Sequence, residues 1–186
     1  MTAGLHLILG GQRSGKSRAA EEAARNWLER SAGHEALFIA TAQDTAGEMA
    51  QRIARHRADR ARTLPAAATL ECPLALDEAV RTQSSPQRLL VIDCLTLWLV
   101  NALMPPPPHN ALTESAWLDL QARTLDALRA APGPVVLVSN EIGLGVVPLA
   151  APVRAYVDAL GRLNQAMAAQ AQRVTLMVAG CALTLR

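Results

Sequence analysis

Lysine is almost absent from this chain of 186 residues, and aromatic residues are scarce. Of the 18 basic residues, 17 are arginine and one, Lys16, is lysine, while Tyr and Phe occur once each. So few aromatic side chains argue against the base-stacking platforms of RNA-binding sheets. A net charge of +2 provides no strongly basic surface for a polyanion. We therefore expect no nucleic acid among the partners.

The scarcity of lysine draws attention to the one position that keeps it. Where a composition has drifted toward arginine, lysine persists best at sites that need a compact ammonium and cannot fit a planar guanidinium. This argument singles out Lys16.

Long hydrophobic runs and cysteine pairs are also missing. No apolar run reaches the length of a bilayer span, and the first ten residues lack a charged leader. Cys72, Cys94 and Cys181 form no C-x-x-C pair or metal-ligand pattern, so we expect reduced, buried thiols. With 51% apolar and 18% charged residues, the chain is not disordered. We expect one soluble, cytoplasmic domain covering residues 1–186.

The hydrophobic pattern predicts an α/β fold. Apolar runs typical of buried strands alternate with helical periodicity. The expected strands cover residues 5–9, 36–40, 69–71, 89–92, 135–138 and 175–178, and the expected helices cover 17–30, 48–60, 74–81, 95–104, 114–131 and 153–173. Such alternation is typical of a mostly parallel, doubly wound sheet, which binds ligands beyond the carboxyl ends of its strands.

A phosphate-binding loop follows the first expected strand. The sequence Gly10, Gly11, Gln12, Arg13, Ser14, Gly15, Lys16, Ser17 matches G-x-x-x-x-G-K-[ST], and a helix is expected directly after it. Backbone N–H groups of such a loop converge on phosphate oxygens. Lys16 would contact the terminal phosphates of ATP or GTP, and the Ser17 hydroxyl would ligate Mg²⁺.

Asp93 ends the apolar run at 89–92. A carboxylate at this place in a phosphate-loop protein orients the metal ion, so Asp93 is a candidate Mg²⁺ ligand together with Ser17. A strand-end Asp can instead cap the helix that follows it, here near Thr96.

His56 lies in a second basic region. If residues 52–60 are helical, Arg52, His56 and Arg60 share one face. Neighbouring positive charges would keep the imidazole neutral and nucleophilic, and the arginines could hold a triphosphate. The alternative is a solvated basic helix with an incidental histidine.

Six sequence blocks in order resemble one family. They are GGQRSGKS at 10–17, IATAQ at 39–43, R-I-x-x-H-R-x-x-R at 52–60, DCLTLW at 93–98, SNEIGLGVVP at 139–148 and GRLNQ at 161–165. This series is similar to the bifunctional adenosylcobinamide kinase / adenosylcobinamide-phosphate guanylyltransferases of cobalamin biosynthesis. The resemblance spans nearly the whole chain and implies a phosphate-loop NTPase fold of the RecA-like type.

The resemblance implies two activities and further site residues. ATP or GTP phosphorylates adenosylcobinamide, and GMP from GTP then passes through a His56–GMP intermediate to adenosylcobinamide phosphate, giving adenosylcobinamide-GDP. It also implies a homotrimer. Beyond the phosphate loop, the implied nucleotide contacts are Thr41, Ala42, Gln43, Arg57, Ala58, Asp59, Arg60, Glu71 and Asp93.

Two other functions remain open from the residues alone. One is a simple phosphate-loop kinase in which His56 is idle, and the other is a nucleotide-gated binding module. A regulatory GTPase is disfavoured, because its N-K-x-D motif needs a second lysine.

Overall fold

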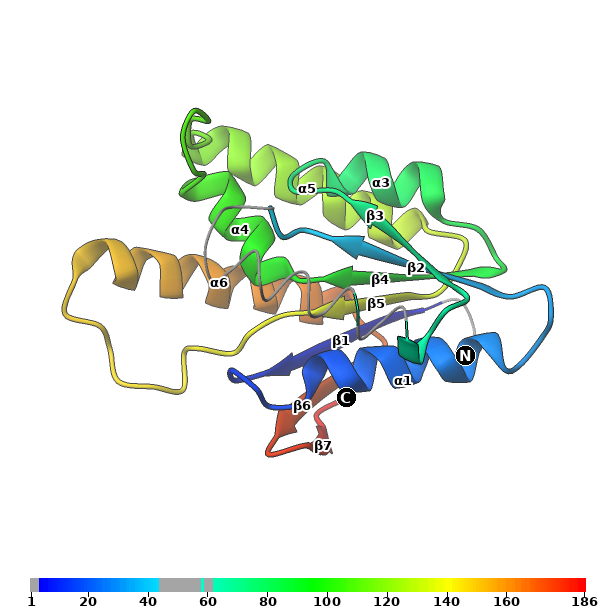
Figure 1. The fold of residues 1–186 in the computed structure, drawn as a ribbon. Helices are drawn as coiled ribbons and strands as arrows, with labels where there is room; N and C mark the ends of the chain where they lie inside the picture. The colour runs from blue at the N-terminus through cyan, green and yellow to red at the C-terminus, as the bar shows by residue number, and fades with distance from the viewer. Residues whose placement is uncertain (1–3, 44–57, 59–61) are drawn as a thin grey trace.

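A single mixed sheet organises the part of the chain that the computed structural model describes, residues 4–43, 58 and 62–186. Its order is β3-β2-β4-β5-β1-β6-β7 (Figure 1). The strands are β1 (Leu5–Gly10), β2 (Glu35–Ala40), β3 (Ala67–Glu71), β4 (Arg88–Asp93), β5 (Val135–Val138), β6 (Arg173–Val178) and β7 (Cys181–Thr184). The helices described are α1 (Lys16–Leu28), α3 (Leu76–Gln83), α4 (Leu95–Leu103), α5 (Glu114–Ala130) and α6 (Ala151–Gln170).

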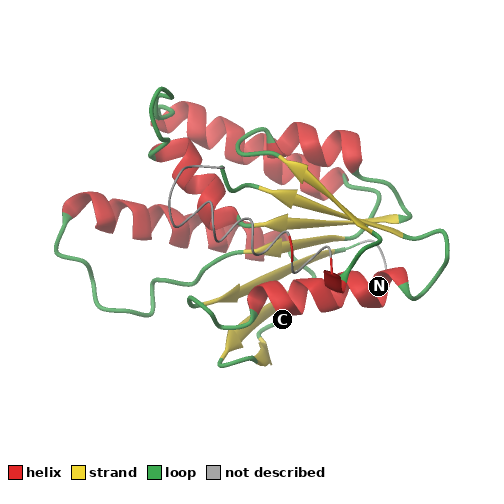
Figure 2. Cartoon of the chain, viewed as in Figure 1, coloured by secondary structure: helices red, strands yellow, loops and turns green. Residues whose placement is uncertain are grey.

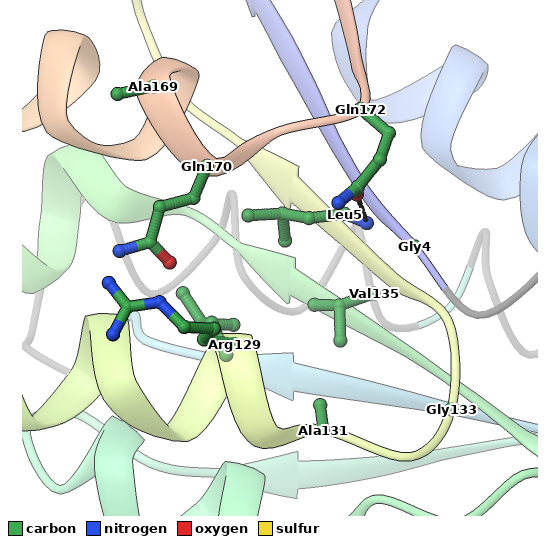
Figure 3. A pocket seen from close by; sticks show the side chains of 10 residues that line it. Gly4, Leu5, Arg129, Ala131, Gly133, Val135, Ala169, Gln170 and Gln172 are labelled. Carbon is green, nitrogen blue, oxygen red and sulfur yellow. Dashed lines mark hydrogen bonds between the residues drawn. The ribbon is translucent and has the colours of Figure 1, made fainter.

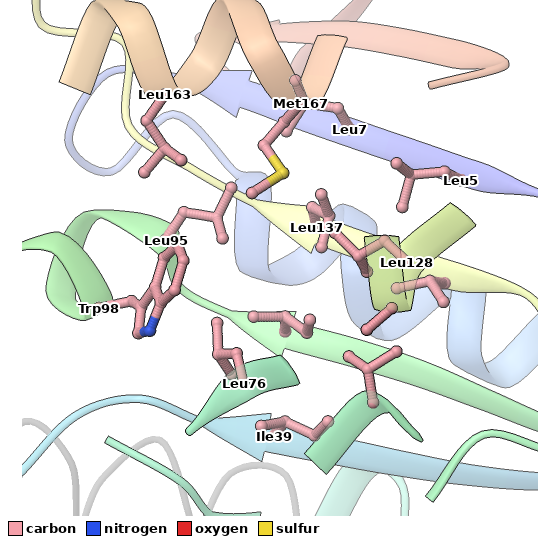
Figure 4. Packing of buried hydrophobic residues seen from close by; sticks show 14 of the residues in the cluster. Leu5, Leu7, Ile39, Leu76, Leu95, Trp98, Leu128, Leu137, Leu163 and Met167 are labelled. Atoms are coloured by element: carbon pink, nitrogen blue, oxygen red, sulfur yellow. The ribbon is translucent and has the colours of Figure 1, made fainter. Parts of the chain in front are cut away.

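Helices cover both faces of the sheet (Figure 2). Alternate residues of each strand point to opposite faces. Accordingly Leu7 packs in the larger core cluster with residues of α3, α4, α5 and α6, whereas Ile8 packs in the smaller one with residues of α1. Figure 4 shows the larger cluster, in which Trp98 of α4 and Met167 of α6 approach the strands. Burial on both faces explains why the central strands read as unbroken apolar runs.

The strand connections confirm the predicted α/β class. Strands β1 to β6 pair in parallel, and only β7 pairs antiparallel, with β6. Strand β5 lies between β1, which leads into the phosphate loop, and β4, which ends at Asp93. This separation of the two strands agrees with the predicted RecA-like arrangement.

Three local expectations were wrong or incomplete. The last long helix was expected to continue to 173, but α6 ends at Gln170 and Arg173 begins β6. Cys181 is exposed, although burial was expected of all three thiols; Cys72 is buried and Cys94 is half-buried. The expected helix over 48–60 lies outside the described residues apart from Ala58, which is helical. Within the described chain, the helices lack the length and apolar character needed to cross a membrane.

Gly133 offers a test of the packing between the α5–β5 connection and the turn that leads into β4. A Cβ at this position would lie 2.0 Å from the Ser85 carbonyl oxygen and 2.8 Å from that of Arg88, both backbone atoms. We expect Gly133→Ala to lower the free energy of unfolding by about 1–3 kcal/mol, because the backbone must shift. Urea unfolding measures this change.

Gly161→Ala is the matched control. Gly161 lies in α6, where an added Cβ meets no atom of the described chain within 4 Å. Removing a helical glycine there should raise stability by roughly 0.5–1 kcal/mol. Equal unfolding midpoints for the two variants would contradict the packing described at Gly133.

Candidate active site

Backbone crowding fixes the phosphate loop between β1 and α1. A Cβ on Gly10 would lie 2.5 Å from both the Met177 carbonyl oxygen and the Ser14 Oγ, so only glycine fits. Gly15, at the N-cap of α1, has a φ of 102°, in the left-handed region that glycine adopts without strain. The conformation that the motif predicts is therefore enforced by the neighbouring strand β6 as well as by the loop itself.

The amino end of α1 is suited to an anion. Its first turn carries no acidic residue, and within the described chain no side chain caps it. The free N–H groups and the helix dipole of such an end favour phosphate. Lys16 is 8% exposed and its Nζ donates to the carbonyl oxygens of Gly10, at 2.9 Å, and Gly11, at 2.6 Å. The ammonium thus lies over the loop, with the half-buried Ser17 beside it in the chain.

The hairpin turn between β6 and β7, near the carboxyl terminus of the chain, contacts the phosphate loop. Ala179 and Gly180 join β6 to β7 with φ values of 52° and 81°, as a two-residue type I′ turn requires. The Gly180 N–H donates to the Ser14 carbonyl oxygen at 2.9 Å. Sequence reasoning gave this hairpin no role. The Ala179-Gly180 pair between two apolar runs could have predicted the turn, but it could not have predicted the contact with Ser14.

Asp93 ends β4 on the same edge of the sheet. It is half-buried and lies in register with Ala40 of β2 and Val138 of β5. Helix α4 has Cys94, and not Asp93, at its N-cap position. Asp93 therefore does not occupy the capping position that was the alternative to metal binding.

Thr41 holds the backbone next to Asp93. Its side chain is fully buried, and its hydroxyl donates to the Cys94 carbonyl oxygen at 2.7 Å and accepts from the Cys94 N–H at 2.9 Å. Asn101 of α4 donates to the Thr41 carbonyl oxygen at 2.7 Å and to that of Pro73 at 2.9 Å. Thr41 thus fixes the position of the Cys94 backbone, next to Asp93. Ala42 and Gln43, the other two nucleotide contacts predicted at this strand end, are half-buried.

The turn after β5 links three elements around the site. The Glu141 N–H donates to the Gly10 carbonyl oxygen at 3.0 Å, and the Asn140 N–H donates to Thr96 Oγ1 at 2.9 Å. Asn164 of α6 is buried, accepts from Ser139 Oγ at 2.7 Å and donates to the Asn140 carbonyl oxygen at 3.0 Å. Sequence analysis gave Asn140, Glu141 and Asn164 only as members of two family blocks and assigned none of them a role.

Two weak acids near Thr96, the side chains of Cys94 and Tyr156, stay protonated near neutral pH. Burial, followed by the nearby Asp93 charge, raises the pKa of the Cys94 thiol to about 11. Burial raises the pKa of Tyr156 to about 12, and its hydroxyl donates to the Thr96 carbonyl oxygen at 3.1 Å. Neither group is a ready nucleophile, because the thiolate and phenolate are disfavoured.

The remaining predicted residues are only partly described. Glu71 ends the edge strand β3, is exposed, and lies in register with Ala40, which also pairs with Asp93. Ala58 is exposed. His56, Arg57, Asp59 and Arg60 lie outside the described residues, as does Arg52. The structure therefore brings together the phosphate loop, Thr41 and Asp93 at one sheet edge and does not test the position of His56.

The oxygen donors at this edge suit a hard cation bound with a nucleotide. Ser17 offers a hydroxyl and Asp93 a carboxylate, and Mg²⁺ commonly takes one or two protein oxygens together with substrate phosphates and waters. Within the described residues no group of three His, Cys, Asp or Glu side chains forms a metal site. The donor set thus fits a shared, substrate-bound Mg²⁺ better than a fully protein-bound metal.

A cavity of about 410 Å³ lies at the other end of the sheet (Figure 3). It is lined by the first residues of two strands, Leu5 of β1 and Val135 of β5, together with Arg129, Gln170 and Gln172. The amino ends of the strands are the edge away from the phosphate loop. This cavity is separate from the candidate active site.

Comparison with known proteins identifies relatives along nearly the full chain. Residues 6–185 match the family described as cobinamide kinase / cobinamide phosphate guanyltransferase. A bifunctional adenosylcobalamin biosynthesis protein of Pseudomonas aeruginosa is 48% identical over 181 residues, covering 97% of this chain and 96% of that protein. A protein of the same description from Salmonella typhimurium is 36% identical over 182 residues, covering 94% and 95%.

A solved structure supports the fold alone. The flagellar accessory protein FlaH of Methanocaldococcus jannaschii aligns with a TM-score of 0.53 at 12% identity, covering 98% of this chain and 78% of that chain. The sequence matches, unlike the similarity of fold, show the family. The chain belongs to the cobinamide kinase / cobinamide phosphate guanyltransferase family, a family of bifunctional enzymes of cobalamin biosynthesis.

Proposed function

We propose that the protein phosphorylates adenosylcobinamide with ATP or GTP and then transfers GMP from GTP, through a histidine adduct, to adenosylcobinamide phosphate. The observation that carries the first half is the phosphate loop, with a buried Lys16 over its carbonyl oxygens and an uncapped α1 behind it in the described chain. Family membership supports the pairing of the two activities. Residues 1–186 act as one catalytic domain, assembled as the cytoplasmic homotrimer that the family resemblance implies.

In the kinase step, the chain's own groups bind and orient the triphosphate. Backbone N–H groups from Gly11 to Ser17 and the Lys16 ammonium neutralise charge on the terminal phosphates. The acceptor hydroxyl oxygen bonds to the terminal phosphorus, the bond to the leaving nucleoside diphosphate breaks, and the hydroxyl proton is released. Ser17 and Asp93 would hold Mg²⁺, which supplies further neutralisation of phosphate charge.

In the guanylyl step, His56 attacks the α-phosphorus of GTP. A P–N bond forms, and pyrophosphate leaves. A phosphate oxygen of adenosylcobinamide phosphate then attacks the same phosphorus, and the imidazole departs with its electron pair restored. Arg57, Ala58, Asp59, Arg60 and Glu71 contact the guanine nucleotide in this proposal.

The compact charge of Lys16 predicts a steep dependence of kinase activity on this residue. Lys16→Ala should lower kcat/KM for phosphoryl transfer by roughly 100-fold or more, as removal of one preorganised charge at a transition state does. Lys16→Arg should fail nearly as badly, because the planar guanidinium does not fit over the Gly10 and Gly11 carbonyl oxygens.

The assay is ATP-dependent phosphorylation of adenosylcobinamide, with circular dichroism to verify folding. Arg18→Ala, an exposed change in the same helical turn, is the control and should keep its activity. If Lys16→Arg kept most of the wild-type rate, the requirement for an ammonium would be refuted.

A metal role for Asp93 predicts a magnesium-dependent defect. Asp93→Asn keeps the shape of the side chain and removes its charge, so turnover should fall at limiting Mg²⁺ and recover partly at high Mg²⁺. The measurement is a Mg²⁺ titration of phosphoryl transfer. Asp119→Asn, an exposed carboxylate on α5, provides the control. Unchanged turnover of Asp93→Asn at limiting Mg²⁺ would assign Asp93 a purely structural role.

The histidine adduct predicts a label of defined chemistry. GTP labelled at the α-phosphate should label the protein, whereas γ-labelled GTP should not, and the adduct should be acid-labile and alkali-stable. His56→Ala should lose both the label and GMP transfer, yet retain phosphorylation of adenosylcobinamide. The exposed His109→Ala serves as control and should label normally. Full labelling of His56→Ala would instead favour the simple kinase.

A further inference from the structure

The loop between β5 and α6 exposes large apolar side chains in succession. In this apolar loop, residues 142–149, Leu144 is 81% exposed, Val146 97%, Val147 71% and Leu149 97%. Scattered apolar residues on a surface need no explanation, but a contiguous group usually marks a binding surface. The apolar loop is therefore a candidate binding surface.

Hydrogen bonds hold both ends of the apolar loop. At its start, Glu141 Oε1 accepts from the Gly143 N–H at 2.6 Å, while the Glu141 N–H donates to the Gly10 carbonyl oxygen at 3.0 Å. At its end, the Arg154 guanidinium donates to the carbonyl oxygens of Pro148, at 2.9 Å, and Leu149. The loop is thus tied to the phosphate loop, and it leaves the sheet at the same edge (Figure 1).

A cavity of about 520 Å³ lies between the apolar loop and α6. One wall is apolar and is formed by Ile142, Val146, Val147 and Pro148. The other wall comes from α6 and carries Arg154, Asp158, Arg162 and Gln165. A volume of this size is typical of small-molecule sites, which combine apolar lining with a few polar groups that fix orientation.

The two walls differ from what a triphosphate needs. Phosphates are bound by convergent N–H groups and cations, which the phosphate loop already supplies. An apolar surface opposite a row of donors and acceptors instead suits a large, flat molecule with apolar faces and primary amides at its rim. The family description names cobinamide as the acceptor. Cobinamide is such a molecule, because it is a corrin ring with amide side chains at its rim.

We infer that this cavity and the apolar loop bind the corrin ring of the acceptor. Apolar side chains of the loop contact a ring face, and Asp158, Arg162 and Gln165 hydrogen-bond to the rim amides. The ring is then held beside the phosphate loop, so that its hydroxyl arm reaches the terminal phosphate. This inference rests on the proposed function, since it takes its ligand from the proposed acceptor.

A second copy of the chain is the other candidate for covering these side chains. The concave shape and the polar α6 wall favour a ligand, because the core of a protein–protein contact is depleted of charged residues. Arg154, Asp158 and Arg162 line the cavity directly opposite the apolar loop. We therefore take the acceptor as the occupant and make self-association an outcome of the test.

The test replaces exposed side chains whose loss does not disturb the core. In Val146→Ser/Val147→Ser, KM for adenosylcobinamide should rise about tenfold or more, since two apolar contacts are lost. The values of kcat, KM for ATP and labelling by α-labelled GTP should stay within about twofold of wild type. Equilibrium dialysis against cobinamide, followed by its visible absorbance, should show the same loss of affinity. Gln165→Leu should weaken cobinamide binding in the same assay.

Leu183→Ser, a change at an exposed apolar residue of β7 that does not line the cavity, is the control and should bind cobinamide normally. Unchanged affinity of the double variant would overturn the inference, as would a changed sedimentation coefficient with cobinamide binding intact, which would make the loop a subunit contact. Wild-type protein that retains cobinamide in dialysis but does not phosphorylate adenosylcobinamide would contradict the proposed function and leave this binding site standing.

Discussion

The carbonyl oxygen of Gly10 is the junction on which the candidate site depends. It accepts from the Lys16 ammonium at 2.9 Å and from the Glu141 N–H at 3.0 Å, so one atom ties the phosphate loop to the turn after β5. The junction requires a residue without a Cβ, because the Met177 carbonyl oxygen occupies the place a Cβ would take. Lys16 and the start of the apolar loop are therefore positioned by the same peptide group.

Buried polar side chains extend this junction across the sheet edge. Thr41 and Asn101 fix the backbone around Cys94, and Asn164 fixes the turn at Asn140. A buried polar group without a partner would be costly, so these side chains are satisfied in only one arrangement of strands and helices. Burial in the apolar core holds the layers together, whereas these hydrogen bonds determine where the strand ends lie relative to one another.

Local signals explain what could be predicted. The apolar runs predicted the central strands, and the glycine spacing predicted a loop that does follow β1 and enter α1. Contacts between residues distant in sequence were beyond such signals. Two hydrogen bonds show this: Gly180 donates to Ser14, and Asn164 donates to Asn140. Each joins segments that are distant in the sequence, and hydrophobic periodicity does not predict which distant segments meet. The family resemblance placed Thr41 among the nucleotide contacts, and local signals could not show that its hydroxyl is engaged with Cys94.

The proposed function requires one domain to bind two kinds of ligand. A triphosphate is recognised through charge, which the phosphate loop concentrates at the amino end of α1. A corrin ring carries little charge and is recognised through apolar area and amide hydrogen bonds, which in the inferred site the apolar loop and α6 would supply. The Glu141 N–H, which donates to the Gly10 carbonyl oxygen, joins the start of the apolar loop to the phosphate loop. In the proposed arrangement, phosphoryl transfer takes place where the hydroxyl arm of the acceptor reaches from the apolar loop to the phosphate loop.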